Sequence, residues 1–284
     1  HSFPTRRSSE SEERRVGKQF ADFGWRIPFL LSAVLVFFAY IIRKKMEETP
    51  VFMQMKSSGN ISAAPVKESL SKKSLKLIFM IVFGGNAAQS TIMQTAQFIT
   101  LYFLQRTVKL EETTTYIILA VATFLGMPFY QLSGKWSDKF GRKKVIYWGI
   151  CLAAISIPVS FYLFKTLGNP LDLTETHTVS ISLTLLFILL TLINTIAGGL
   201  VYGPMGAFVM EYFDSRIRYT SMGFTHNVGN GIIGGATPLV TEFLRTTIVA
   251  GAFLAPYTGL IYPMGLILLA LIINPFLKEN KEKK

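Results

Sequence analysis

One short stretch of the chain, "GKWSDKFGRKK" from Gly134 to Lys144, gathers six charged side chains in eleven positions. Asp138 is the single acid among five basic residues. A carboxylate in this setting can accept hydrogen bonds from a helix N-terminus or pair with the planar fork of Arg142. Gly134 would allow helices to approach closely, and Gly141 would allow a tight reversal. The plainer interpretation is a basic loop that only sets membrane topology.

A second stretch, "MEYFDSRIRYTSMGF", offers complementary charges. It places Glu211 at the end of an apolar run, with Arg216 and Arg218 following closely. A carboxylate where a membrane span ends is costly unless it is paired. The two stretches could therefore latch together in one state and separate in another, as the bistable elements of switching proteins do.

Polar side chains also occur deep inside apolar blocks. The richest block carries four amides, which are Asn86, Gln89, Gln94 and Gln97. Gln89, Gln94 and Gln97 point into one broad sector of a helix. We interpret them as candidates for lining a substrate cavity. The alternative is ordinary hydrogen bonding between helices, which contributes only about 0.6 kcal/mol on average in membranes.

A later block, "GFTHNVGNGIIGG", carries His226, Asn227 and Asn230. His226 is the only residue within the apolar blocks that titrates near neutral pH, so it is a candidate proton carrier or substrate ligand. It lies near the end of its block, however, so a role in a gate or an interface is equally open. Asn194 and Tyr202 are further cavity candidates, although each alone is more typical of packing.

Composition identifies the class of protein. Only 16% of the 284 residues are charged, 23 are Phe, and the mean hydropathy is +0.39. A soluble domain has about a quarter of its residues charged. The net charge of +12 does not indicate nucleic-acid binding, because the basic residues lie between the apolar blocks. We therefore expect a membrane protein with the lipid bilayer as a partner and no nucleic acid.

Seven apolar blocks are long enough, or nearly so, to cross a hydrocarbon core of ~30 Å as helices. They do not alternate with period two, which excludes barrel strands. The blocks are Trp25–Ile42, Leu77–Leu104, Thr114–Leu132, Val145–Phe164, Val179–Tyr212, Ser221–Leu244 and Phe253–Leu277. Pairs of glycines at small-x-x-x-small spacing, Gly199/Gly203 and Gly231/Gly235, should let helix backbones approach closely.

Basic residues predict the orientation, since Lys and Arg accumulate in cytoplasmic loops. Alternate connections, Arg43–Lys76, Ser133–Lys144, Phe213–Thr220 and the tail from Lys278, hold nineteen Lys and Arg residues. The opposite connections hold four. The first group should therefore be cytoplasmic, and the C-terminus with it.

The first nineteen residues differ from the rest, being polar and rich in Arg and Ser. They resemble translated sequencing-adaptor DNA, so residues 1–19 are expected to be a non-native or disordered arm, the alternative being a basic anchoring arm. Residues 20–42 would form one helix, 43–76 a cytoplasmic linker, 77–277 a six-helix bundle and 278–284 a cytoplasmic tail.

The charged stretches resemble a known family. "GKWSDKFGRKK" is similar to the signature loop of the major facilitator superfamily, and Glu211 through Arg218 resembles an element of its sugar-porter-like branches. "FGWRIPFLLS", "QFITLYFL", "VYGPMGAFVMEYF" and "RYTSMGF" are similar to segments of its metabolite:proton symporters, which carry proline/betaine, shikimate, α-ketoglutarate and citrate. The resemblance covers about Phe20 to Leu277. Gln89 and Gln97 match polar positions of that branch, whereas Gln94 stands where an aromatic residue is more usual.

The resemblance implies an all-α fold of twelve helices in two six-helix bundles. This chain would hold the sixth helix, the central loop and the whole C-terminal bundle, and would lack the N-terminal bundle. The family's cytoplasmic gate network would comprise Gly134, Asp138, Gly141, Arg142, Glu211 and Arg218.

These features predict a secondary transporter of the bacterial inner membrane that takes up a small polar metabolite, such as an organic acid or a proline/betaine-like solute, together with H+. A sugar-porter-like carrier is one alternative, and a membrane receptor or scaffold on the same fold is another. No metal-ligand spacing, nucleophile elbow or phosphate-binding glycine loop appears in the sequence, so neither a cofactor, a metal nor an enzyme is expected.

Overall fold

The computed structural model describes residues 20–24, 26–46, 48, 50–59, 62–248, 251 and 254–277. In these ranges the chain is helical between short connections, with one isolated bridge pairing Leu110 and His177 and no named strand. The expected all-α fold is confirmed. The expectations for residues 1–19 and 278–284 fall outside the described residues.

The chain divides into two units, His1–Ile61 and Ser62–Lys284. The first contains a short π-helix η1 (Phe20–Gly24), the long helix α2 (Arg26–Lys45) and the short helix α3 (Pro50–Ser57). Helix α2 is apolar along its length, ends in three basic residues and buries none of its residues within the unit. A helix of this kind requires an apolar surrounding, either lipid or other helices.

The second unit begins with the short helix α4 (Pro65–Ser69), followed by one continuous helical run over Lys72–Thr107. π-Helical turns interrupt this run three times. Its segments are α5 (Lys72–Ile81), η2 (Val82–Asn86), α6 (Ala87–Gln94), η3 (Thr95–Ile99), α7 (Thr100–Tyr102) and η4 (Phe103–Thr107). Ser71 begins the run by accepting a hydrogen bond from the backbone N–H of Ser74. π-Helical turns occur often at functional sites, so this run is a candidate to contribute to one.

Three long, nearly regular helices follow. They are α8 (Glu112–Phe140), α9 (Arg142–Gly168) and α10 (Ile181–Tyr212). Each contains one proline, and in each the chain stays helical through it. The next element is interrupted again, with α11 (Arg218–His226), the π-helical η5 (Asn227–Gly234), a turn at Gly235 and Ala236, and α12 (Thr237–Thr247). The last comprises η6 (Ala255–Leu260), α13 (Ile261–Ile273) and η7 (Asn274–Phe276).

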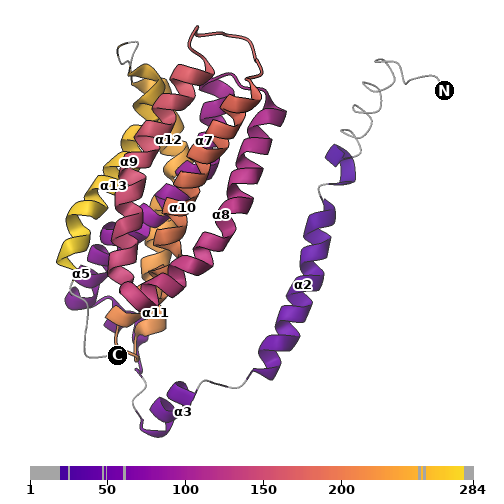
Figure 1. The fold of residues 1–284 in the computed structure, drawn as a ribbon. Coiled ribbons are helices and arrows are strands. Elements are labelled where there is room, and N and C mark those ends of the chain that lie inside the picture. Colours follow the sequence, from indigo (N-terminus) through magenta and orange to yellow (C-terminus); the bar gives the residue numbers. More distant parts are fainter. Residues whose placement is uncertain are drawn as a thin grey trace. The chain divides into compact units, whose positions relative to one another are not determined.

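Helix α10 is central to the second unit and packs along both α8 and α9 (Figure 1). Segment α6 packs against η5 and against α13, which also contacts α9. Four phenylalanines, Phe161, Phe164, Phe187 and Phe208, are almost fully buried in the core. The bundle has two ends. The Arg142 end holds the starts of α5, α9 and α11, and the Arg245 end holds the ends of η4, α9 and α12.

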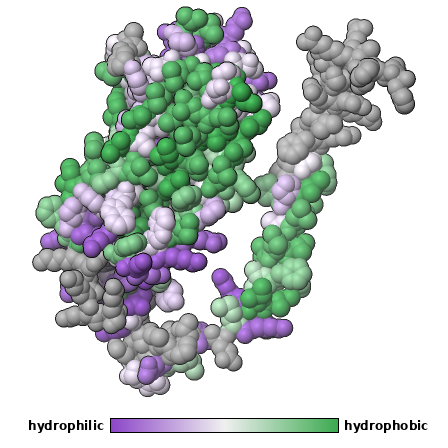
Figure 2. Space-filling model, viewed as in Figure 1, coloured by the Kyte–Doolittle hydropathy of each residue, from purple (hydrophilic) through white to green (hydrophobic). Residues whose placement is uncertain are grey.

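Six helical segments in the described chain are long and apolar enough to cross a membrane. They coincide with six of the seven expected blocks, and the seventh, Ser221–Leu244, is helical but is broken by the turn at Gly235 and Ala236. Figure 2 shows a broad apolar surface on the visible face of the second unit, with hydrophilic side chains gathered at its two ends. This is the distribution that a bilayer imposes on a spanning bundle.

Two of the expected connections are corrected by the structure. Ser133–Lys144 is not a loop, because α8 continues to Phe140, α9 starts at Arg142, and Gly141 alone makes the turn. Gly141 has φ = 99°, a conformation that side chains other than glycine rarely adopt. Arg43–Lys76 is likewise not simply a linker, because it includes the end of α2, the start of α5 and two short helices.

Candidate functional site

The acidic and basic residues of the two charged stretches meet at the Arg142 end. Arg142 Nε lies 3.0 Å from Glu211 Oε1, and Arg142 Nη2 lies 3.5 Å from Asp138 Oδ1. Its side chain is 26% exposed, against 50% for Glu211 and 71% for Asp138. Arg142, at the start of α9, thus joins the ends of α8 and α10. We call Asp138, Arg142 and Glu211 the Arg142 cluster.

The other candidate gate residues lie around this cluster without joining its ion pairs. Gly141 is the turn before Arg142, and Gly134 lies one helical turn before Asp138 on α8. Arg218 Nε donates to the carbonyl oxygen of Phe213 at 3.3 Å and does not pair with Glu211. Glu211 of the second stretch pairs instead with Arg142 of the first.

Further contacts at the same end could not be predicted from the sequence. Lys143 Nζ donates to the carbonyl oxygens of Pro275 and Leu277, at 2.8 and 2.6 Å, and so satisfies acceptors at the end of the last helix. The hydroxyls of Ser69 and Ser221 lie 3.0 Å apart. A lysine in a basic stretch looks like a topology signal, and only its position beside the last helix shows that it also caps helix ends.

A cavity of about 630 Å³ opens between α6, α10, α11 and η5. Its polar lining consists of five residues that the sequence singled out, Gln89, Tyr202, His226, Asn227 and Asn230. Met205 and the glycines Gly203, Gly206 and Gly231 complete its wall. A volume in this range suits a small molecule. Among the residues that line it, only His226 and Tyr202 have titratable side chains.

Two amides lie against the ring of His226, one from the buried Asn86 and one from Asn230, which also lines the cavity. The Nδ2 atoms of Asn86 and Asn230 lie 3.1 and 3.3 Å from His226 Nδ1. Asn86 Nδ2 also lies 3.5 Å from Gln89 Oε1. Both distances to the ring suit hydrogen bonds between the amides and the ring, and which atom donates depends on the tautomer of the ring.

This network depends on a close approach of the two interrupted helices. Asn86 is fully buried in η2, and its side chain fills the space beside Gly229 of η5, where a Cβ atom would clash. Ser90 lies in the same way against Gly234. The expected pair Gly231/Gly235 does not make this contact, because Gly231 faces open space and Gly235 faces its own helix. The small residues were recognised correctly, but the wrong pair was assigned to the interface.

The remaining cavity candidates lie elsewhere. Gln94 and Gln97 are partly buried and do not line the cavity. Asn194 is fully buried in α10, and neither atom of its amide has a hydrogen-bond partner within the described chain. Tyr130, which the sequence did not single out, packs edge-on against Tyr202 with ring centroids 5.6 Å apart. No group of three His, Cys, Asp or Glu residues in the described ranges is arranged to hold a metal ion.

Comparisons with known proteins agree with this architecture. A family model described as Major Facilitator Superfamily matches residues 16–238. The chain is 29% identical over 234 residues to a Staphylococcus aureus (strain MSSA476) protein named "Putative proline/betaine transporter", covering 81% of this chain and 46% of that protein. A Staphylococcus haemolyticus protein of the same name is 29% identical, with coverages of 89% and 51%.

A third relative is the inner membrane metabolite transport protein YhjE of Escherichia coli (strain K12). It is 27% identical over 266 residues, covering 86% of this chain and 53% of the relative. The chain thus spans about half the length of the curated relatives it matches. No solved structure matches it. All three relatives carry the names of transport proteins, none that of an enzyme.

Proposed function

Because the chain belongs to the Major Facilitator Superfamily, we propose that it provides one bundle of a secondary active transporter for a small polar metabolite coupled to H+. The chain is a multi-pass membrane protein. The observation that carries the proposal is the cavity between α6, α10, α11 and η5, whose polar lining comes from four amide or hydroxyl side chains and one histidine. A second bundle, corresponding to the other half of its relatives, would close the cavity.

The chemistry of the wall favours a solute without net charge. Gln89, Asn227 and Asn230 offer both donors and acceptors, and the ring of His226 offers one of each when neutral. A charged solute would leave an unbalanced charge against this wall, whereas a zwitterion of the proline/betaine type would not. The names of the staphylococcal relatives support the same class of solute. An organic acid would need its countercharge from the second bundle.

A sugar is the second candidate, because amides and a tyrosine hydroxyl also suit the hydroxyl groups of a sugar. A receptor or scaffold would need no accumulation of solute at all. These alternatives differ in what they do rather than in their fold, so an uptake measurement separates them.

The transport cycle would be a population shift between two states of the protein. We propose that the Arg142 cluster, with Gly134, Gly141 and Arg218 around it, is a gate on the cytoplasmic side. The concentration of Lys and Arg at this end supports that orientation, and it would place the C-terminus in the cytoplasm. The bacterial relatives support the inner membrane as the location.

Uptake of radiolabelled proline, betaine and glucose by cells producing the whole protein tests this proposal. We expect proline or betaine to accumulate above the outside concentration and the gradient to collapse when a proton uncoupler is added. Glucose uptake alone would point to the sugar carrier. Uptake that the uncoupler does not reduce would contradict proton coupling. The absence of uptake of any of the three solutes would favour a receptor.

Replacing His226 by glutamine should separate binding from coupling. Glutamine keeps hydrogen-bonding capacity toward Asn86 and Asn230 but does not titrate. We expect His226→Gln to retain exchange of labelled for unlabelled solute while losing accumulation against a gradient. His177→Gln is the matched control, because the His177 ring bonds the carbonyl of Gly168 at the far end of α9. Undiminished accumulation by His226→Gln would exclude His226 as the proton carrier.

A further inference from the structure

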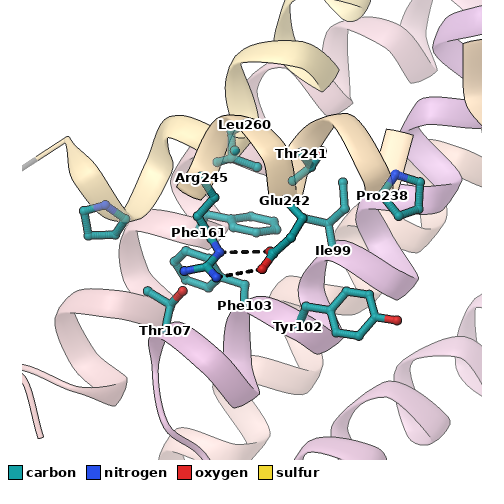
Figure 3. Close-up of a pocket in the computed structure, with 12 residues that line it drawn as sticks. Ile99, Tyr102, Phe103, Thr107, Phe161, Pro238, Thr241, Glu242, Arg245 and Leu260 are labelled. Carbon is teal, nitrogen blue, oxygen red and sulfur yellow. Dashed lines mark hydrogen bonds and ion pairs between the residues drawn. The ribbon is translucent and has the colours of Figure 1, made fainter. Parts of the chain in front are cut away.

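A second charged cluster lies at the Arg245 end, away from the cavity. Glu242 on α12 receives bonds from Arg245 Nε and Nη2, at 2.9 and 2.7 Å, and from Arg106 Nη1 at 2.9 Å (Figure 3 shows the Arg245 bonds). Arg106 comes from η4, so the cluster joins the two interrupted helical elements. Two arginines share one carboxylate, and one positive charge is left without a countercharge within the cluster.

The arginines also keep unused hydrogen-bond donors. A guanidinium has five N–H groups, whereas the bonds to Glu242 occupy two groups of Arg245 and one of Arg106. The Arg106 guanidinium lies over the ring of Tyr102, 4.9 Å from its centroid, which leaves its edge available. An anion can therefore bind here without displacing Glu242.

A small pocket adjoins the cluster. It encloses about 30 Å³, and its lining includes the buried apolar side chains of Ile99, Phe103 and Phe161 together with Glu242 and Arg245 (Figure 3). This space holds roughly two groups the size of a water molecule. It fits the short aliphatic end of a small molecule, whose carboxylate would lie beside Arg245 and Thr241, but not a phosphate with its four oxygens.

Thr241 supplies an independent observation. Its side chain lines the pocket and is only 8% exposed, yet its hydroxyl has no hydrogen-bond partner among the described residues. Leaving a buried hydroxyl without a partner costs about 1–3 kcal/mol. If the bond between Arg106 and Glu242 only held the two helical elements together, it would not explain why this hydroxyl is buried without a partner. A ligand oxygen in the pocket would satisfy it.

We propose that the pocket beside Arg106, Thr241 and Arg245 is a second binding site, which takes the carboxylate of a small aliphatic acid or zwitterion. The spare guanidinium N–H groups and the Thr241 hydroxyl bind the carboxylate oxygens. Phe103 and Phe161 receive the aliphatic part. The site shares no residue with the cavity. If the Arg142 end is cytoplasmic, as proposed above, this site faces the outside and is the first that an incoming solute meets.

Chemical modification tests the site without relying on transport. Phenylglyoxal reacts with arginine side chains, and peptide mass spectrometry measures its reaction rate at Arg245 in membranes that contain the whole protein. Propionate at about ten times its Kd leaves roughly a tenth of the sites free, so it should slow modification of Arg245 about tenfold. Propionamide, which has the same shape without the charge, should not slow it. Arg142 in the same sample is the internal control and should react at an unchanged rate.

Two substitutions sharpen the test. Arg106→Gln removes the uncompensated charge and should abolish protection of Arg245 by propionate, whereas Arg106→Lys should restore it. Thr241→Val keeps the shape and all three arginine–glutamate bonds, and should weaken protection about three- to tenfold through the loss of one hydrogen bond. Equal protection by propionamide, protection by inorganic phosphate as strong as that by propionate, or no protection at all would overturn the proposal. None of these results depends on whether the protein transports.

Discussion

Arg142→Gln is expected to reduce uptake by the whole protein at least about tenfold while leaving its insertion into the membrane intact. Arg142 pairs with both Glu211 and Asp138, so the substitution removes both ion pairs together. A shift of 1.4 kcal/mol between two states changes their ratio tenfold. A partly buried, charge-assisted bond such as that from Arg142 to Glu211 contributes about this amount.

The stability of the bundle should respond much less than its transport. Asp138 is mostly exposed, and exposed ion pairs contribute at most about 1 kcal/mol to folding. Asp138→Asn should therefore also reduce transport, by less than Arg142→Gln, without loss of membrane insertion, because it weakens one contact of the gate rather than the core. The measurement is uptake normalised to the amount of protein in the membrane.

Arg216→Gln is the matched control for Arg142→Gln. Arg216 lies at the same end and pairs with Glu68 at 3.5 Å, but it does not contact the Arg142 cluster. Its replacement should leave uptake within about twofold, since exposed pairs of this kind contribute little. In a double-mutant cycle, Glu211→Gln should add little to Arg142→Gln, because the pair is already broken. Normal uptake by Arg142→Gln would remove the basis for a gate at this cluster.

The helices were predictable from the sequence because each apolar block reaches, or nearly reaches, the length that a bilayer requires. The meeting of Asp138, Arg142 and Glu211 could also be anticipated, since carboxylates at the ends of spans require partners. Which basic residue pairs with Glu211 could not be predicted, because Arg218 and Arg142 are equally basic in the sequence. The packing of α9 beside α10 places Arg142 next to Glu211.

The extent of each helix was harder to predict than its existence. Hydropathy falls at Ser133, where polar residues begin, but the backbone bonds of α8 continue to Phe140 because charged side chains are compatible with a helix that leaves the membrane. The π-helical turns of η2, η3, η4 and η5 likewise have no compositional signature. They became visible only in the backbone hydrogen bonds.

Part of the cavity wall could be predicted from the sequence. An amide within an apolar block is recognisable by its residue type, but the direction in which its side chain points is not. Gln89 and Gln97 occupy related positions on one face of a regular helix, yet only Gln89 lines the cavity. The π-helical turn η3 lies at Gln97 and changes the angular register of the side chains beyond α6. The interruption thus defeats the periodicity on which the expectation for Gln97 depended. Gln94 lies in the same regular segment as Gln89 but about 140° around the helix from it.

The contact of α8 with α10 gives the second large prediction, at Gly203. A Cβ atom on Gly203 would clash with the hydroxyl of Ser133, and would lie 2.6 Å from the carbonyl oxygen of Tyr130 and 3.1 Å from the backbone nitrogen of Gly134. Two of these three atoms belong to the backbone of α8, so no side chain can rotate away to make room. The two helices would have to separate.

Separation would also break a hydrogen bond between the helices, because Ser133 Oγ donates to the carbonyl oxygen of Gly199 at 2.8 Å. We therefore expect Gly203→Ala to lower the free energy of unfolding of the bundle by about 1–3 kcal/mol, the usual cost of overpacking. Thermal unfolding of the purified whole protein in detergent measures the loss. Uptake should fall as well, since the same contact positions Asp138 opposite Arg142.

Gly206→Ala is the matched control on the same helix, one turn further along. A Cβ atom there meets nothing within 4 Å, so the substitution should be neutral or should stabilise the helix by roughly 0.5–1 kcal/mol, the usual gain when alanine replaces glycine in a helix. Opposite signs for two identical substitutions three residues apart can arise only from the close approach of α8. If Gly203→Ala proved as stable as Gly206→Ala, α8 and α10 could not lie as close together as described.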